Sequence, residues 1–115
     1  MRDFQLPGRS PCMAMNGMAA TQNPHATRTA IEVLKNGGAA IDAAVAAAAV
    51  LAVMEPQQTG IGGDCFAIIA KNGTDDVVAY NGSGRTPRNL PENGFARDGE
   101  KLQDSSPHAV TIPGA

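Results

Sequence analysis

Apolar residues recur with the period of an α-helix in the stretch that follows Asn23-Pro24. They stand three or four residues apart on one face: Ala26, Ala30, Val33 and Leu34. Asn is a preferred N-cap, and Pro fits the first helical position because that position needs no hydrogen-bonded N–H. Asn36-Gly37-Gly38 is a typical helix end. The pattern predicts a first helix over residues 24–36.

A second helix is predicted over residues 39–54, where Ala, the residue with the highest helix propensity, dominates. Pro56 disfavours a helical Glu55 and ends it. The helix is apolar almost all round, which predicts burial between layers of a larger fold. It is about 16 residues long, whereas a membrane span needs about 20. We therefore expect no membrane span here.

Two short apolar runs predict a β-hairpin, CFAIIA over residues 65–70 and VVAYN over 77–81. Asn72-Gly73 between them is a strong hairpin-turn signal. Weaker patterns suggest a short strand in 14–20 and the start of another in 106–115, whereas 1–15 reads as extended or mobile. The fold class expected is α/β, of the α+β kind, with helices packed on a β-hairpin. Two helices and one hairpin leave strand edges unpaired, so the whole of 1–115 reads as one segment of a larger domain.

Composition supports the interpretation as a fragment. Of the 115 residues 43% are apolar but only 3% are aromatic. Because Ala buries little area, hydrophobic stabilisation per residue should be low, which favours packing against something larger. The net charge is −2 and the Lys and Arg residues are scattered, so nucleic-acid binding is not expected.

The cysteines and histidines predict no metal site, disulfide or cofactor. Cys12 and Cys65 have no CxxC spacing, and Cys65 is expected to be a buried, inert thiol at the head of a strand. His25 and His108 lack ligand spacing and are expected to be structural. The first residues contain no apolar core of signal-peptide length, which predicts a cytoplasmic protein, or a periplasmic or secreted one if the true N-terminus is missing.

The loop TGIGGD carries Gly60, Gly62, Gly63 and Asp64 between a helix and a strand. An anion cradle is one interpretation, but phosphate loops run from strand to helix, the reverse order. We expect the glycines to allow positive φ and close packing. Asp64 is either catalytic or, more commonly for such a residue, bonded to the loop amides. Asp42 should complement the dipole of the second helix.

Arg85 follows Asn81-Gly82-Ser83-Gly84 at the end of a predicted strand and precedes Thr86-Pro87. A guanidinium in such a place can hold a carboxylate through two parallel hydrogen bonds. From local sequence alone, a surface or structural arginine is the commoner alternative. Ser83 has no GxSxG context and no obvious base, so it is not a candidate nucleophile.

From about Asn16 onward the chain resembles the start of the γ-glutamyltransferase (γ-glutamyltranspeptidase) large subunit. The resemblance rests on NGMAAT, NPHAT, AIEVLKNGGAAIDAAVAAAAVLAVMEP, TGIGGDCFA, NGSGRTP and SPHAVTIPGA. Together these motifs are specific, although each alone is weak. The chain departs from the family at Ala39, where GGNA is usual, and at Gln57, where His is frequent.

The resemblance implies part of an N-terminal-nucleophile hydrolase, a four-layer αββα sandwich made from a self-cleaving precursor. The nucleophile would be the threonine that begins the small subunit, with its own amine as base. No catalytic residue lies in this chain, since Thr59 and Thr111 are internal, so the chain alone should be inactive. By motif position Arg85 would bind the α-carboxylate of the γ-glutamyl group. The implied partners are the rest of the large subunit, the small subunit and a γ-glutamyl substrate resembling glutathione.

Three other functions stay open at this stage. A cephalosporin or glutaryl acylase of the same superfamily would take dicarboxylic acyl groups that lack the α-amino group. A non-catalytic module could bind small anions through TGIGGD and Arg85. A purely structural fragment would become ordered only with its missing half.

Overall fold

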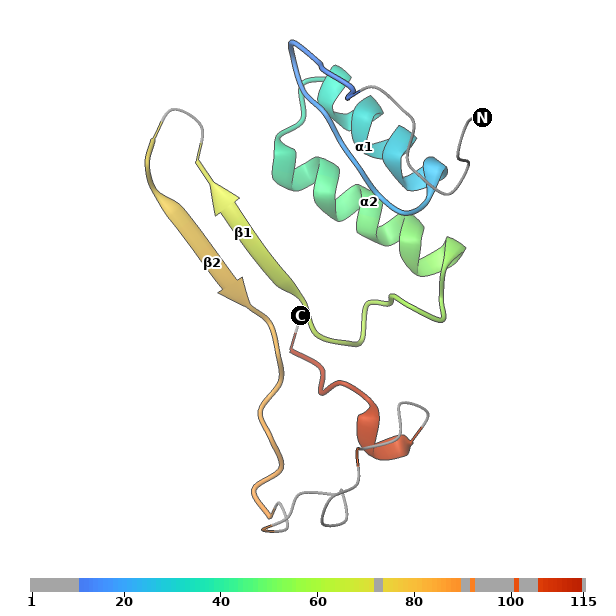
Figure 1. Cartoon of the computed structure of the whole chain (residues 1–115), viewed down its shortest axis with the longest axis vertical. Helices are drawn as coiled ribbons and strands as arrows, with labels where there is room; N and C mark the ends of the chain where they lie inside the picture. The colour runs from blue at the N-terminus through green and yellow to red at the C-terminus, as the bar shows by residue number, and fades with distance from the viewer. Residues whose placement is uncertain (1–10, 72–73, 90–91, 93–100, 102–105, 115) are drawn as a thin grey trace, which may run out of the picture. The chain divides into compact units, whose positions relative to one another are not determined.

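A computed structural model shows two helices, one β-hairpin and a short 3-10 helix (Figure 1). It describes residues 11–71, 74–89, 92, 101 and 106–114. The elements in chain order are α1 (Pro24–Lys35), α2 (Ala40–Met54), β1 (Phe66–Ala70), β2 (Val77–Asn81) and η1 (Pro107–Ala109). The chain divides into two compact units, Met1–Val50 and Leu51–Ala115. Helices and an antiparallel hairpin confirm the α+β class.

Both ends of α1 are closed by local hydrogen bonds. The Asn23 side-chain oxygen accepts from the His25 N–H at 2.9 Å, with Pro24 in the first turn. At the other end Gly37 has φ of +86°. Its N–H donates to the Leu34 carbonyl at 3.1 Å, and the Gly38 N–H donates to the Val33 carbonyl at 3.0 Å. This pair of bonds is a Schellman motif, and the predicted helix over 24–36 is confirmed as Pro24–Lys35.

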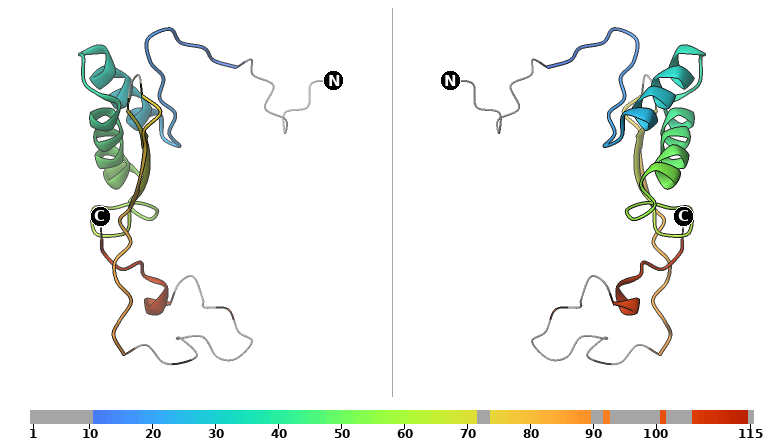
Figure 2. Two further views of the ribbon diagram at one scale, coloured as in Figure 1. Left: turned by 90° about the vertical axis from the view of Figure 1, so that its left-hand side faces the viewer. Right: turned by 90° about the vertical axis from the view of Figure 1, so that its right-hand side faces the viewer.

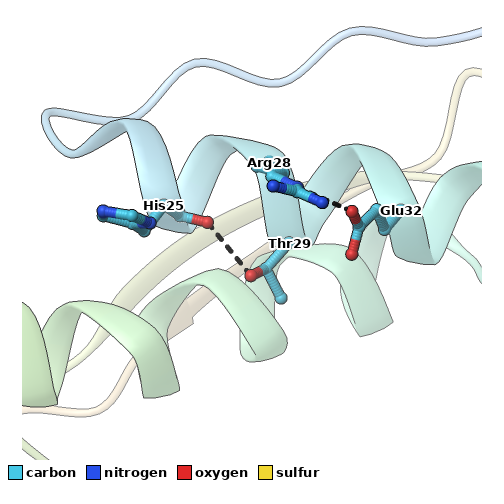
Figure 3. A network of polar contacts seen from close by, with 4 residues as sticks. All are labelled: His25, Arg28, Thr29 and Glu32. Atoms are coloured by element: carbon cyan, nitrogen blue, oxygen red, sulfur yellow. Dashed lines mark hydrogen bonds and ion pairs between the residues drawn. The ribbon is translucent and has the colours of Figure 1, made fainter.

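The exposed side of α1 carries a small polar network (Figure 3). The Arg28 Nε donates to the Glu32 carboxylate at 2.8 Å, one helical turn away. The Thr29 hydroxyl donates to the His25 carbonyl at 3.0 Å. The hydrogen bond from Arg28 to Glu32, and secondarily the Glu32 charge, raise the pKa of the Arg28 guanidinium. Exposed pairs of this kind add little stability, so this network marks a solvated face.

The helix α2 begins with a backbone-to-carboxylate bond, in which the Ala39 N–H donates to Asp42 at 2.9 Å. This is the acceptor half of a capping box, and it agrees with the expected role of Asp42 at the helix start. The Glu55 N–H closes the last turn on the Leu51 carbonyl at 2.8 Å, directly before Pro56. The prediction of 39–54 is thus confirmed as Ala40–Met54. None of the helices in the described ranges is long and apolar enough to cross a membrane.

The hydrophobic core of the described chain consists of four alanines: Ala26, Ala30, Ala43 and Ala47, each at most 5% exposed. In each helix the two alanines are four residues apart and so form one strip. The two helices lie side by side (Figures 1 and 2), and each of them buries one such pair of alanines. The described residues do not bury α2 on all sides, as its sequence predicts for the complete fold, since Val45 is 64% and Val53 78% exposed.

The strands β1 and β2 pair antiparallel, from Phe66 opposite Asn81 to Ala70 opposite Val77. Both predicted strands are confirmed, whereas the turn residues Asn72 and Gly73 lie outside the described ranges. The strands carry exposed apolar side chains: Phe66, Ile68, Val77, Val78 and Tyr80. Cys65 is exposed as well, so the expectation of a buried thiol is wrong. On the strand that follows Cys65, Phe66 is 65% and Ile68 81% exposed.

The two weaker strand predictions are wrong in the described ranges. The segment 14–20 forms no strand, because its backbone pairs with no sheet edge. In 106–114, Ser106 accepts from the His108 N–H at 3.2 Å and caps η1 (Pro107–Ala109). The residues after η1 are not assigned to a strand, because they hydrogen-bond to loops.

Candidate functional site

Three loop segments meet beside the end of β2, all within the unit Leu51–Ala115. The Gly82 N–H donates to the Cys65 carbonyl at 2.7 Å, and the Cys65 N–H donates back at 3.3 Å. The Gly84 N–H donates to the Ile112 carbonyl at 3.0 Å. The Gly114 N–H donates to the Gly63 carbonyl at 3.2 Å. We call Gly63, Gly82, Gly84 and Gly114 the glycine junction, because backbone contacts the backbone there.

Side chains are excluded from three positions of the glycine junction. A Cβ on Gly84 would lie 2.5 Å from the Pro113 carbonyl oxygen, and a Cβ on Gly82 would lie 2.8 Å from the Cys65 carbonyl oxygen. A Cβ on Gly114 would lie 2.5 Å from the Gly84 nitrogen. Real Cβ atoms do not approach so closely, so an alanine at any of these positions would force the segments apart. Close approach, and not positive φ, is what these glycines provide.

Arg85 follows the glycine junction directly. The bend before it is closed by a hydrogen bond from the Ser83 N–H to the Asn81 side-chain oxygen at 3.0 Å, a typical Asx turn. The Arg85 side chain is exposed and forms no hydrogen bond or ion pair with the residues that the structure describes. It lines none of the described hollows. The guanidinium thus has no partner among the described residues, and the bend before it is held by hydrogen bonds from the Ser83 and Gly84 N–H groups.

The TGIGGD loop borders a hollow of about 620 Å³. The hollow is lined by Pro56, Gln57, Gln58, Thr59, Gly60, Gly62, Gly63, Asp64, Ala109, Val110 and Thr111. The expectation that the glycines of this loop have positive φ is wrong, since in the described ranges Gly37 alone has a positive φ. Close packing holds at Gly63, where a Cβ would lie 3.2 Å from the Thr111 hydroxyl, but Gly60 and Gly62 have open space.

Asp64 does not hold the loop amides as expected. Its side chain is half-buried on the wall of the hollow and bonds to none of the described residues. Thr59 and Thr111 line the same hollow as internal residues. No group of three or more His, Cys, Asp or Glu that could hold a metal ion occurs in the ranges that the structure describes. His25 and His108 lie in different units.

The local sequence indicates Arg85 as a candidate but gives no sign of the backbone contact at Gly84, the residue directly before it. Gly84 and Gly114 lie far apart in the chain, and nothing in NGSG or IPGA taken separately predicts that they meet. The one hint in the sequence is that each of these two loops has a glycine next to residues typical of turns, proline in IPGA and asparagine in NGSG.

Comparison with known proteins assigns the family. The model of the family described as gamma-glutamyltranspeptidase matches residues 26–115. The glutathione hydrolase-like YwrD proenzyme of Bacillus subtilis (strain 168) is 40% identical over 80% of this chain, and glutathione hydrolase 2 of Arabidopsis thaliana is 37% identical over 89%. The oxamate amidohydrolase proenzyme of Klebsiella pneumoniae is 40% identical over 63%. The chain spans only 18%, 17% and 13% of these relatives' lengths.

Solved structures agree. The gamma-glutamyltranspeptidase of Helicobacter pylori superposes with a TM-score of 0.72 and 32% identity, covering 91% of this chain and 31% of that one. The gamma-glutamyltranspeptidase of Pseudomonas nitroreducens, complexed with L-DON, superposes with a TM-score of 0.70 and 29% identity, covering 89% of this chain and 31% of that one. The described helices and hairpin are thus part of an N-terminal-nucleophile hydrolase fold, and the chain belongs to the γ-glutamyltranspeptidase family.

Proposed function

We propose that this chain is the N-terminal part of the large subunit of an enzyme that cleaves γ-glutamyl amides and passes the γ-glutamyl group to water or to an acceptor amine. The family match over residues 26–115 supports this, as do the relatives named glutathione hydrolases. The relatives are several times longer than the chain, so the rest of the large subunit and a small subunit would be its partners.

Arg85 is the observation that carries the substrate class. It is a cation without a protein partner in the described ranges, on a bend fixed by Asn81 and the glycine junction. A planar guanidinium can hold a carboxylate with two parallel hydrogen bonds. We assign to Arg85 the α-carboxylate of the γ-glutamyl group. This contact would fix one end of the acyl group and so align the amide for attack.

The bond-breaking groups would come from outside this chain. A threonine hydroxyl at the start of the small subunit attacks the amide carbonyl, and its own amine takes the hydroxyl proton and gives it to the leaving amine. The ester that forms is then opened by water or by an acceptor amine. No step needs a cofactor, and the 115-residue chain by itself would be inactive.

A second candidate is an amidase or acylase for another carboxylate-bearing amide. The relative named oxamate amidohydrolase favours it, because oxamate also carries a carboxylate beside an amide. A glutaryl acylase would use the same carboxylate contact. These candidates differ from the first in needing no recognition of the α-amino group.

Three substrates given to the complete protein distinguish these functions. We expect kcat/KM for γ-glutamyl-4-nitroanilide to exceed that for glutaryl-4-nitroanilide by about 10²-fold or more, since a site built to bond an amino group rejects an analogue without it. Oxamate should release no ammonia. The 115-residue chain alone is the matched control and should release no arylamine. Faster turnover of the glutaryl anilide, or ammonia from oxamate, would overturn the γ-glutamyl assignment.

A further inference from the structure

We propose that Gly84 and the segment 112–114 that packs on it are the positioning elements for Arg85. This inference rests on the carboxylate-binding role proposed for Arg85 above. It adds that the place of the carboxylate site is set by a backbone contact between NGSG and IPG, two loops distant in sequence.

The segment 112–114 is tied at both of its ends. The Ile112 carbonyl accepts from the Gly84 N–H at 3.0 Å. At the other end the Gly114 N–H donates to the Gly63 carbonyl at 3.2 Å, and the Gly114 carbonyl accepts from the Tyr80 hydroxyl at 3.3 Å. The segment therefore connects the loop before β1, the strand β2 and the bend before Arg85.

The contact has no room for a side chain. A Cβ at Gly84 would lie 2.5 Å from the Pro113 carbonyl oxygen and 2.8 Å from the Ile112 carbonyl oxygen. Both neighbours are backbone atoms, which cannot rotate away as the end of a flexible side chain could. An added methyl group must therefore move the backbone at position 84, and the next residue moves with it.

The position of the Arg85 guanidinium depends on the backbone more than the position of a tightly packed side chain would. Its guanidinium has no partner among the described residues, so its own contacts do not fix its place. The position of the Arg85 backbone is then the main constraint that the chain supplies. Displacements of about 1 Å are enough to cost roughly 10²-fold in a site that depends on alignment.

The test is Gly84→Ala in the complete protein with two anilide substrates. We expect KM for γ-glutamyl-4-nitroanilide to rise roughly 10- to 100-fold with little change in kcat. For 4-aminobutyryl-4-nitroanilide, in which hydrogen replaces the α-carboxylate, kcat/KM should stay unchanged, because Arg85 has nothing to hold. Equal losses on both substrates would show general damage and overturn the proposal. Gly17→Ala is the control, since a Cβ there meets only Leu34 at 3.4 Å.

A double-mutant cycle separates this inference from the proposed function. If Gly84 acts through Arg85, then Gly84→Ala has no further effect in an Arg85→Ala background. If Arg85→Ala alone leaves KM unchanged, the carboxylate role itself is wrong. If Arg85→Ala raises KM but Gly84→Ala does not, the proposed function stands and the positioning role is wrong.

A second variant covers the case in which Gly84→Ala does not fold. Pro113→Gly loosens the segment 112–114 without adding atoms to the glycine junction. We expect a smaller rise in KM, about threefold to tenfold, again confined to the substrate that has the α-carboxylate. An unchanged KM, or an equal effect on both substrates, would overturn the proposal.

Discussion

Single residues decide where α1 begins and ends. The Asn23 side chain accepts a hydrogen bond from one of the backbone N–H groups of the first turn that have no partner within the helix. Gly37 takes the left-handed conformation that closes the last turn. Both were predictable from the sequence, because the chemistry of a cap depends on a few adjacent residues.

Replacing the N-cap should weaken α1 measurably. We expect Asn23→Ala to lower the free energy of unfolding by about 1 kcal/mol, because the His25 N–H loses its acceptor. Urea unfolding of the complete protein, followed by far-ultraviolet circular dichroism, would measure this. Asn23→Ser retains an acceptor and should cost much less. An equal loss in both variants would contradict the capping role.

Other residues could not be placed from the sequence. Cys65 was expected to be buried because an apolar run follows it, but its burial depends on what covers β1, which local pattern does not encode. Asp64 was expected to bond to its own loop and does not. The contact of Gly84 with Pro113 joins distant loops and could be seen only in three dimensions.

At the scale of elements, α1 and α2 pack through alanines. Ala26 is completely buried and Ala47 is 5% exposed. The side chains that the two helices bury are therefore small ones. Periodicity predicted the first helix and the helix propensity of alanine the second, but neither indicated which strip of α2 is covered, since that helix is apolar on nearly every side.

Enlarging one alanine tests this packing. We expect Ala47→Leu to destabilise the helix pair by about 1–3 kcal/mol through overpacking. Ala48→Leu, one residue along on the exposed side of the same helix, should change stability by about 0.5 kcal/mol at most. Thermal unfolding of the complete protein carrying each variant, beside the parent protein, would show the difference. Similar midpoints for both variants would show that the strip is not packed.

Of the predicted strands, the two of the hairpin were predictable from the local sequence, whereas the one near the end of the chain was not. The hairpin was predictable because its two apolar runs are close in sequence and flank a turn signal. The segment 106–115 was predicted as the start of a strand, yet in its described part the Ile112 C=O and Gly114 N–H groups bond to the backbone of loops, and Ser106-Pro107 starts a 3-10 helix. Strand identity depends on a partner edge, which the local sequence does not specify.

At the scale of the whole molecule, the core buried within the described ranges consists of four alanines, and both strands leave large apolar side chains exposed. Such surfaces are usually covered in a stable domain. Together with relatives several times longer, this fits a segment that completes its fold with other parts of an enzyme. The family was recognisable in the sequence because several motifs occur in order.

The most direct test of the account is the kinetics of Arg85 variants in the complete protein with γ-glutamyl-4-nitroanilide. A charge-assisted contact of about 1.5–3 kcal/mol predicts that Arg85→Ala raises KM roughly 10- to 150-fold, with kcat much less affected. Arg85→Lys should recover only part, because a point charge replaces the planar fork. A KM unchanged in Arg85→Ala would contradict the claim that this guanidinium binds the substrate's α-carboxylate.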